Sequence, residues 1–218
     1  MGTWTHWLAP HFQHGYAIEP DPDALAVLQT DLPANVTVQA YGAWDTNATV
    51  TFFRYAETVH TSAHFDDEGI NTGPRTGAIA LSCRALDTLE IAGPVDFLKC
   101  DTEGAEIQVL LGAEQLIRRD RPWLLIEAHS LENCLTLARM LAEWNYLFTI
   151  VRHPEYEPFS RWWYAHCWFS CQPMERVTVS TSLSVAPEAP PTVAERPGPT
   201  HTLSEYARWV AEGADYPE

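Results

Sequence analysis

A short apolar run that ends in an acidic, glycine-containing turn places the strongest constraint on the fold of this chain. Residues 95–106 read VDFLKCDTEGAE, and a helical pattern begins directly after them. Buried parallel strands carry nearly continuous apolar runs, and α/β sheets bind ligands outside the carboxyl ends of their strands. The pattern therefore predicts a strand that delivers Asp101, Glu103 and Glu106 to the ligand-binding edge of an α/β sheet.

A second apolar run repeats this arrangement further along the chain. Residues 123–126, WLLI, lead into Glu127 and His129. Because successive strand residues point to opposite faces, Glu127 and His129 face the same way, and so do Lys99 and Asp101. Two neighbouring strand ends would bring these acids and the imidazole to one rim, which indicates a site of chemistry.

The chemistry of these groups is open at this point. Asp101 could hold an amino group, orient a substrate hydroxyl or bind a metal. Glu127 and His129 could act as a base and its orienting partner, or as two ligands of a hard divalent ion. Glu103 and Glu106 are also typical of a helix's first turn, where acids interact favourably with the helix dipole.

The rest of the pattern alternates helices and strands. Apolar spacing predicts helices over residues 3–12, 105–119 and 131–144 and one that begins at Asp21 and Pro22. Strands are expected over residues 16–18, 36–43, 49–55, 78–84, 95–100, 123–126, 146–151 and 162–171. The last two would form an antiparallel pair at a sheet edge, and the whole order predicts one doubly wound α/β domain over residues 1–175.

Two segments depart from this order. Residues 57–77 are rich in Gly, Asn, Thr, Asp and His and too long for an ordinary connection, so we expect a substrate lid or a surface loop. Pro, Ala, Thr, Ser and Glu dominate from about Val177, which predicts a disordered tail over residues 176–218.

Charge and cysteine content exclude several classes of protein. A formal charge of −16 argues against a nucleic-acid-binding face, because phosphate neutralisation needs clustered Lys and Arg. The sequence holds no apolar run of about twenty residues that could span a membrane. Five cysteines without framework spacing, and no apolar leader at the start, favour reduced thiols in the cytoplasm. His166, Cys167 and Cys171 lack the further ligand that a zinc site needs.

Glu19 ends the predicted strand over residues 16–18, directly before the helix start at Asp21 and Pro22. An acidic residue in this position can accept hydrogen bonds from both hydroxyls of a ribose, as in nucleotide sites of Rossmann type. A solvated acid at a strand end is the alternative.

Five segments, in this order, resemble the FkbM family of S-adenosylmethionine-dependent methyltransferases. They are YAIEPDP (16–22), LDTL (86–89), VDFLKCDTEGAE (95–106), LGA (111–113) and RPWLLIE (121–127). The resemblance covers residues 2–151 and implies a class I methyltransferase fold, which is a Rossmann-like, mostly parallel sheet with an antiparallel edge strand. It also implies methyl transfer from S-adenosylmethionine, usually to an oxygen of a small molecule or sugar.

The resemblance further implies a set of cofactor contacts. Glu19 would bind the cofactor's ribose, Gly42, Ala43 and Trp44 would lie near its adenine, and Asp101 would face its methionine part or the acceptor. Gly2 looks like the last glycine of the family's cofactor loop, Asp-x-Gly-Ala-Asn-x-Gly. The family's first strand and the rest of that loop are not among the residues of this chain, so we expect an N-terminally truncated sheet and impaired S-adenosylmethionine binding.

Methyl transfer to oxygen is an in-line displacement that requires removal of the acceptor's hydroxyl proton. We predict His129 as the general base, with Glu127 or Asp101 beside it. A divalent ion bridging Asp101, Glu127 and His129 is a weaker variant with no motif to support it, so no metal ligands are assigned.

The alternative function is a non-catalytic, Rossmann-like binding or interaction module. The incomplete cofactor loop favours it, as does the aromatic cluster Trp162, Trp163, Tyr164 and Trp168. A nucleotide-dependent dehydrogenase is excluded because the chain has no Gly-x-Gly-x-x-Gly. The expected partners are a small-molecule or sugar acceptor and, since a second copy could complete the sheet, a homo-oligomer; nucleic acid and membrane are not expected.

Overall fold

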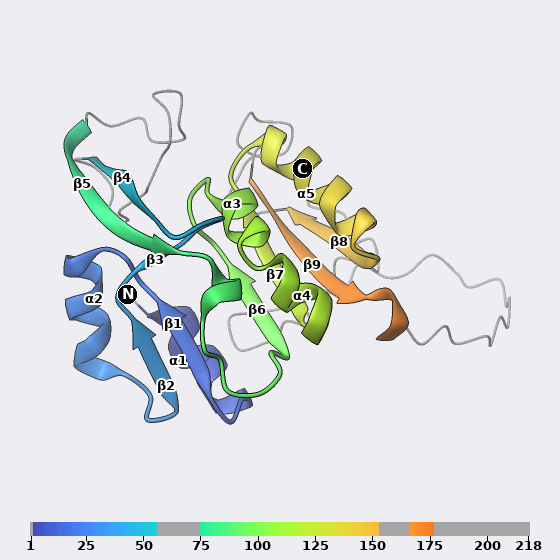
Figure 1. The fold of residues 1–218 in the computed structure, drawn as a ribbon, viewed down its shortest axis with the longest axis horizontal. Coiled ribbons are helices and arrows are strands. Elements are labelled where there is room, and N and C mark those ends of the chain that lie inside the picture. Colours follow the sequence, from blue (N-terminus) through green and yellow to red (C-terminus); the bar gives the residue numbers. More distant parts are fainter. Residues whose placement is uncertain (1, 56–74, 153–165, 177–218) are drawn as a thin grey trace, which may run out of the picture.

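A computed structural model describes residues 2–55, 75–152 and 166–176 of the chain (Figure 1). The predictions for residues 57–74, for Trp162, Trp163 and Tyr164, and for the tail beyond Arg176 lie outside the described residues. The described strands form three hydrogen-bonded sheets, whereas the sequence predicted one.

The N-terminal part follows the sequence prediction closely. Helix α1 (Thr3–Leu8) continues into a 3-10 turn, and strand β1 (Gly15–Ile18) follows. Helix α2 (Pro22–Leu28) begins where predicted, because the Asp21 carboxylate accepts a 2.8 Å hydrogen bond from the Asp23 N–H and proline occupies the first helical position. Strand β2 (Val36–Gln39) then pairs with β1 in parallel.

The prediction of one strand over residues 36–43 is wrong in one respect. This segment forms two strands, β2 and β3 (Gly42–Ala43), which belong to different sheets. β3 pairs with β5 (Arg75–Arg84), and β5 also pairs with β4 (Ala48–Tyr55) in antiparallel fashion. Gly42 makes the pairing close: a Cβ at this position would lie 2.7 Å from the Cys83 Sγ. β2 ends at Gln39, and β3 pairs with β5 from Gly42 onward.

The third sheet has the strand order β6-β7-β9-β8. β6 (Phe97–Cys100) and β7 (Trp123–Ala128) are parallel, and β9 (Cys167–Pro173) runs antiparallel to both β7 and β8 (Tyr146–Arg152). The antiparallel pair predicted at the end of the domain is confirmed. The pair lies at the edge of the sheet as predicted, with β8 outermost. The antiparallel edge strand implied by the resemblance is corrected, because the antiparallel strand β9 lies inside the sheet.

The helix predicted over residues 105–119 consists of two helices, α3 (Glu106–Leu111) and α4 (Glu114–Asp120). The break falls at Gly112, whose position packs so closely on another segment that a Cβ would lie 1.8 Å from the Trp44 carbonyl oxygen. Asp87, in the 3-10 turn Leu86–Thr88, caps α4 by accepting hydrogen bonds from the N–H groups of Gln115 and Leu116. Contacts from distant residues thus interrupt a helix that is continuous by apolar spacing alone.

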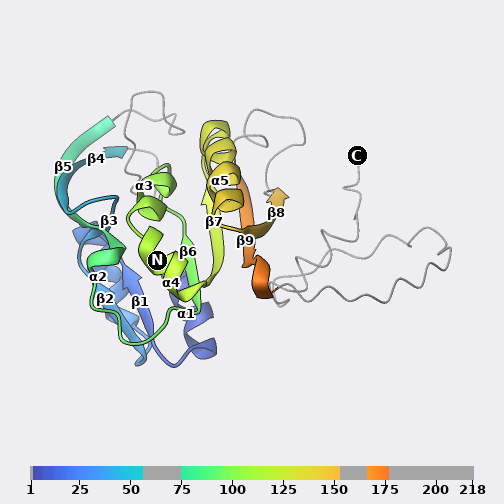
Figure 2. The same ribbon diagram turned by 45° about the vertical axis from the view of Figure 1, so that its right-hand side comes forward.

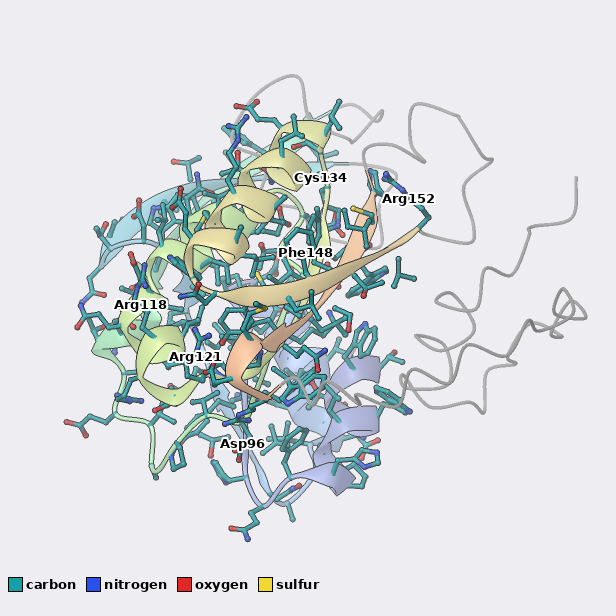
Figure 3. All side chains as sticks on the ribbon, turned by 90° about the vertical axis from the view of Figure 1, so that its right-hand side faces the viewer. Asp96, Arg118, Arg121, Cys134, Phe148 and Arg152 are labelled. Carbon is teal, nitrogen blue, oxygen red and sulfur yellow. The ribbon has the colours of Figure 1, made fainter. Side chains whose placement is uncertain are left out.

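Helices lie on both faces of the third sheet. One face packs against α3, α4 and α5 (Leu131–Glu143) to form the main core, in which Leu137 of α5 and Phe169 of β9 are fully buried (Figures 1 and 2). Cys134 of α5 belongs to this core, with Phe148 of β8 packed against it (Figure 3). The opposite face bears Trp168, whose ring lies 5.5 Å from that of Trp4 in α1.

No helix in the described parts of the chain combines the length and the apolar character needed to cross a membrane.

Candidate active site

Polar side chains converge where β6 and β7 end and β9 begins. β6 and β7 are parallel, so their carboxyl ends meet at one edge, and the register that pairs Ala128 with Cys167 places the start of β9 beside them. We call the resulting group of side chains the rim cluster; its members are Asp101, Glu103, Glu106, Glu127, His129 and His166. The sequence predicted that the first five would meet at this rim, and the structure brings them together.

His129 lies at the centre of the rim cluster and is 2% exposed. Its Nδ1 is 2.8 Å from Glu106 Oε1, within hydrogen-bonding distance. Its Nε2 faces three further carboxylates, at 3.6 Å from Glu103, 3.7 Å from Asp101 and 3.8 Å from Glu127. These three distances exceed that of a direct hydrogen bond. One imidazole nitrogen is therefore fixed by Glu106, and the other points into a space bounded by acidic oxygens.

Glu106 is fully buried and satisfied by several donors. Besides the contact with His129, its Oε1 accepts a 2.8 Å hydrogen bond from the Gly104 N–H, and its Oε2 accepts one of 2.7 Å from the Asn133 side chain. Burial alone would raise the pKa of Glu106, but the hydrogen bond and charge of His129 and the Gly104 N–H outweigh burial and hold the pKa below its ordinary value. Glu106 is thus a buried carboxylate that orients His129, which goes beyond the role of a first-turn helix acid.

The turn between β6 and α3 has an unusual backbone. Glu103 has φ 53° and Gly104 has φ 111°, so two consecutive residues have positive φ. Only glycine takes the second of these conformations without steric cost. The turn directs the Gly104 N–H to Glu106 Oε1 and places the Glu103 carboxylate 3.6 Å from His129.

Proton affinities in the rim cluster are strongly perturbed. Burial, and then the negative charge of Asp101, raise the pKa of Glu127 to about 8. Burial acts to lower the pKa of His129, but the hydrogen bond to Glu106 and the charges of Glu106, Glu103 and Glu127 raise it to about 9. Shifts of this kind, caused by burial together with specific charge partners, are typical of functional sites.

Lys99 connects the rim cluster to the N-terminal helix. Its Nζ donates a 2.7 Å hydrogen bond to Asp101 Oδ2. The same ammonium lies 4.7 Å from the ring centre of Trp4 and 5.3 Å from that of Trp168, both within the range of cation–π attraction. The prediction that Lys99 and Asp101 share a side of the strand is confirmed, and the two form an ion pair.

Two members of the site were not expected from the sequence. His166 precedes β9, is 4% exposed, and has its ring centre 5.3 Å from that of His129. Asn133, in the first turn of α5, donates hydrogen bonds to both Glu106 and the Gly104 carbonyl oxygen. The only sequence signal for Asn133 was its place in a helix that follows a strand ending in polar residues. For His166 the signal was its place beside Cys167 in the strand predicted over residues 162–171.

Among the residues that the structure describes, two sets of three could hold a metal ion. One set is Glu127, His129 and His166, and the other is Asp101, Glu103 and His129; in each set the ligand atoms all lie within 4.8 Å of one another. The first set is buried, whereas the carboxylates of Asp101 and Glu103 are partly exposed.

The residues predicted to contact a cofactor form a second group at the ends of β1 and β3. The Glu19 carboxylate follows β1 and accepts a 2.9 Å hydrogen bond from the Asp21 N–H. Burial raises the pKa of Glu19 more than that hydrogen bond lowers it. Gly42 and Ala43 form β3, and a Cβ at Gly42 would come within 3.6 Å of the Pro20 Cβ, so the ends of β1 and β3 are close together.

The remaining predicted contacts are Gly2, at the start of α1, and Trp44, directly after β3. Gly2 caps α1 with φ 76°, and a Cβ there would lie 2.8 Å from Leu28 of α2. Trp44 follows β3, and its N–H donates to the Arg84 carbonyl oxygen. A pocket of about 330 Å³ lies nearby, and none of its lining residues belongs to the rim cluster. It is lined by Tyr16, Gln39, Tyr41, Arg84, Thr88, Leu89, Glu90 and Ile91.

Comparisons with known proteins identify the family. The chain resembles the crystal structure of methyltransferase FkbM from Methylobacillus flagellatus KT with a TM-score of 0.53 and 24% identity, over 78% of this chain and 41% of that one. At this identity the likeness shows the fold alone, and the chain spans well under half the length of that relative. No curated protein matches the sequence. The profile of the methyltransferase FkbM domain matches residues 3–148, and the chain therefore belongs to the FkbM methyltransferase family.

Proposed function

We propose that this chain is an S-adenosylmethionine-dependent methyltransferase that methylates a hydroxyl oxygen of a small molecule or sugar. The observation that carries the proposal is the rim cluster, in a chain of the FkbM methyltransferase family. A fixed imidazole at a strand end can receive a proton from an acceptor hydroxyl in its neutral form, which for His129 prevails above the pKa of about 9.

The three sheets are, in this proposal, parts of one class I methyltransferase fold. Parallel pairing of β1 with β2 and of β6 with β7 supports this assignment, as do helices on both faces of the third sheet. The cofactor would lie across the carboxyl ends of β1 and β6, which is where α/β folds bind nucleotides.

Glu19 is the proposed ribose ligand. Its carboxylate stands at the end of β1, partly buried and held by the Asp21 N–H, so its orientation is set before a ligand arrives. Gly42, Ala43 and Trp44 would border the adenine, and Gly2 would approach the methionine part. Asp101 would lie between the methionine part and the acceptor.

The proposed reaction forms an oxygen–methyl bond while the sulfonium–methyl bond breaks, and the hydroxyl proton passes to the rim cluster. Its members Asp101, Glu127 and His129 would surround the acceptor oxygen. The contact between Glu106 and His129 Nδ1 leaves Nε2 as the nitrogen that faces this space.

The working environment of the protein is part of the proposal. All five cysteines are buried thiols, which supports a reducing compartment such as the cytoplasm. The small-molecule or sugar acceptor is proposed from membership of the FkbM family. The acidic composition supports the absence of a nucleic-acid partner. We also propose a homo-oligomer, in which a second copy of the chain would complete the sheet at its edge.

Calorimetric titration with S-adenosylmethionine tests the function. It is run on this chain and on one lengthened upstream in frame, since residues matching the family's Asp-x-Gly-Ala-Asn loop are not in this sequence. In the form that binds, Glu19→Gln should weaken affinity about 10- to 100-fold because a charged ribose acceptor is lost. Asp23→Asn, an exposed acid near Glu19, is the matched control and should leave affinity unchanged.

Failure of both chains to bind S-adenosylmethionine would contradict the proposal and favour a non-catalytic Rossmann-like module. Binding that is indifferent to Glu19→Gln would remove Glu19 from the cofactor site.

A further inference from the structure

We infer that Glu127, His129 and His166 form a binding site for one divalent transition-metal ion. The three residues come from two strands that are neighbours in the sheet but distant in sequence: Glu127 lies in β7, His129 follows it, and His166 directly precedes β9. All three side chains are buried, and their ligand atoms lie within 4.8 Å of one another.

The spacing of these atoms fits ligands that share an ion. Metal–nitrogen and metal–oxygen bonds to such ions measure about 2.0–2.2 Å, so two ligands of one ion lie about 3–4 Å apart. His129 Nε2 and Glu127 Oε1 are 3.8 Å apart, which is too long for a hydrogen bond and within this range. The two imidazoles lie edge to face, with an interplanar angle of 79°, so their rings are not stacked. One nitrogen of each ring lies within 4.8 Å of the other and of a Glu127 oxygen.

The surroundings of His129 match those of metal-ligating histidines. Such histidines almost always donate the proton of their second nitrogen to a carboxylate or carbonyl, which fixes the ring and its tautomer. Here Glu106 takes that place at Nδ1, at 2.8 Å, and Asn133 in turn binds Glu106 Oε2 at 2.7 Å. Nε2 is thereby the ligand atom, directed at Glu127 and not at Glu106.

The donor set selects the class of metal. Two imidazole nitrogens and one carboxylate oxygen suit Zn²⁺, Co²⁺ or Mn²⁺, whereas Mg²⁺ and Ca²⁺ prefer oxygen ligands alone. Three protein ligands would leave at least one position open for a small molecule, as in catalytic zinc sites. Asp101 and Glu103, whose oxygens lie within 3.7 Å of Nε2, border that open side.

The role of the ion in catalysis, but not its binding, depends on the proposed function. In a methyltransferase the open position would hold and orient the acceptor hydroxyl and make its proton easier to remove. With His129 Nε2 bound to the ion, the neighbouring Asp101 carboxylate would receive that proton in place of His129. The test therefore measures metal binding in the absence of S-adenosylmethionine and acceptor, so failure of one proposal is distinguishable from failure of the other.

The experiment is a Co²⁺ titration of the chain, with any affinity tag removed and bound metal stripped by chelator. Binding of one Co²⁺ per chain should produce visible absorption bands stronger than those of hydrated Co²⁺, and one equivalent of Zn²⁺ should abolish them. His166→Gln and Glu127→Gln should each weaken affinity at least tenfold. His14→Ala, which removes an exposed histidine at the start of β1, is the control and should change nothing.

Several results would overturn the inference. The first is a wild-type spectrum that remains that of hydrated Co²⁺ throughout the titration. This result needs no variant, so loss of fold in a mutant cannot obscure it. A sulfur-to-cobalt charge-transfer band would instead place the ion on Cys134 or Cys167, whose Sγ atoms lie 3.2 Å apart. Wild-type affinity in His166→Gln, with an unchanged circular dichroism spectrum, would exclude His166 as a ligand.

Discussion

Glu106 Oε1 and His129 Nδ1 lie 2.8 Å apart, and both side chains are buried, although one belongs to α3 and the other follows β7. This contact joins the helical layer to the strand ends and fixes the ring on which the rest of the rim cluster converges. It is therefore important both for the fold and for the proposed chemistry.

Glu106→Gln should destabilise the protein. The amide retains the shape but loses the charge that pairs with His129 and accepts from Gly104 and Asn133, and charged hydrogen bonds in buried sites contribute about 1.5–3 kcal/mol. Urea denaturation should show a loss in that range. Glu114→Gln removes an exposed carboxylate paired with Arg118 and should cost no more than about 0.5 kcal/mol. Equal losses in the two variants would contradict the assigned role of Glu106.

His129→Asn separates the catalytic role of His129 from its structural one. The Asn amide can still donate to Glu106 from near the position of Nδ1, but it has no group in place of Nε2. Turnover with a methyl acceptor should fall about 10²- to 10⁴-fold, the usual contribution of a general acid–base group. Affinity for S-adenosylmethionine should be nearly unchanged. Wild-type turnover in this variant would remove His129 from the mechanism.

Gly112→Ala should be strongly disruptive, although alanine favours helices. The added Cβ would lie 1.8 Å from the Trp44 carbonyl oxygen, so the α3–α4 junction must move away from the backbone that follows β3. We expect a loss of about 1–3 kcal/mol or more in free energy of unfolding. Gly77→Ala in β5 is the control, because a Cβ there meets nothing within 4 Å. Similar stability of the two variants would show that the junction yields without cost.

Tyr146 should make stability fall at alkaline pH. Its hydroxyl donates to the Pro122 carbonyl oxygen at 2.9 Å, and burial raises its pKa from 10.0 to about 12. The unfolded chain therefore loses the phenolic proton near pH 10 while the folded protein keeps it. The stabilisation by Tyr146 is complete below pH 10 and declines as pH rises toward 12.

Comparison of wild type with Tyr146→Phe isolates this effect from other groups that titrate in the same range. Between pH 9 and 11 the stability advantage of the wild type should shrink by about 1 kcal/mol. A constant difference between the two proteins over this interval would show that Tyr146 ionises equally readily in both states.

Features that depend on local sequence were predicted well. The α2 start was predicted from Asp21 and Pro22, and the Asp21 carboxylate accepts a backbone hydrogen bond there. The α5 start at Leu131 was predicted from apolar spacing. The meeting of Asp101 with His129 was also predictable, because it needs only strand alternation and two adjacent parallel strands.

Features that depend on tertiary contacts were not predicted. The break at Gly112 requires knowledge of where Trp44 lies, and the separation of β2 from β3 requires the pairing of Gly42 with Cys83. Likewise, the orienting role of Glu106 becomes visible only once the position of His129 is known. His166 could not be assigned because the register of β9 against β7 decides what its imidazole meets.

The Lys99 ammonium contacts the rings of both Trp4 and Trp168 and donates a hydrogen bond to Asp101, so it contributes both to the docking of α1 and to the rim cluster. Displacement of α1 would withdraw the Trp4 ring from the ammonium and change the charge environment of Asp101. Ligand binding at the rim cluster and docking of the N-terminal helix are therefore linked equilibria. The factor by which helix docking changes the ligand affinity equals the factor by which the ligand changes the docking equilibrium constant.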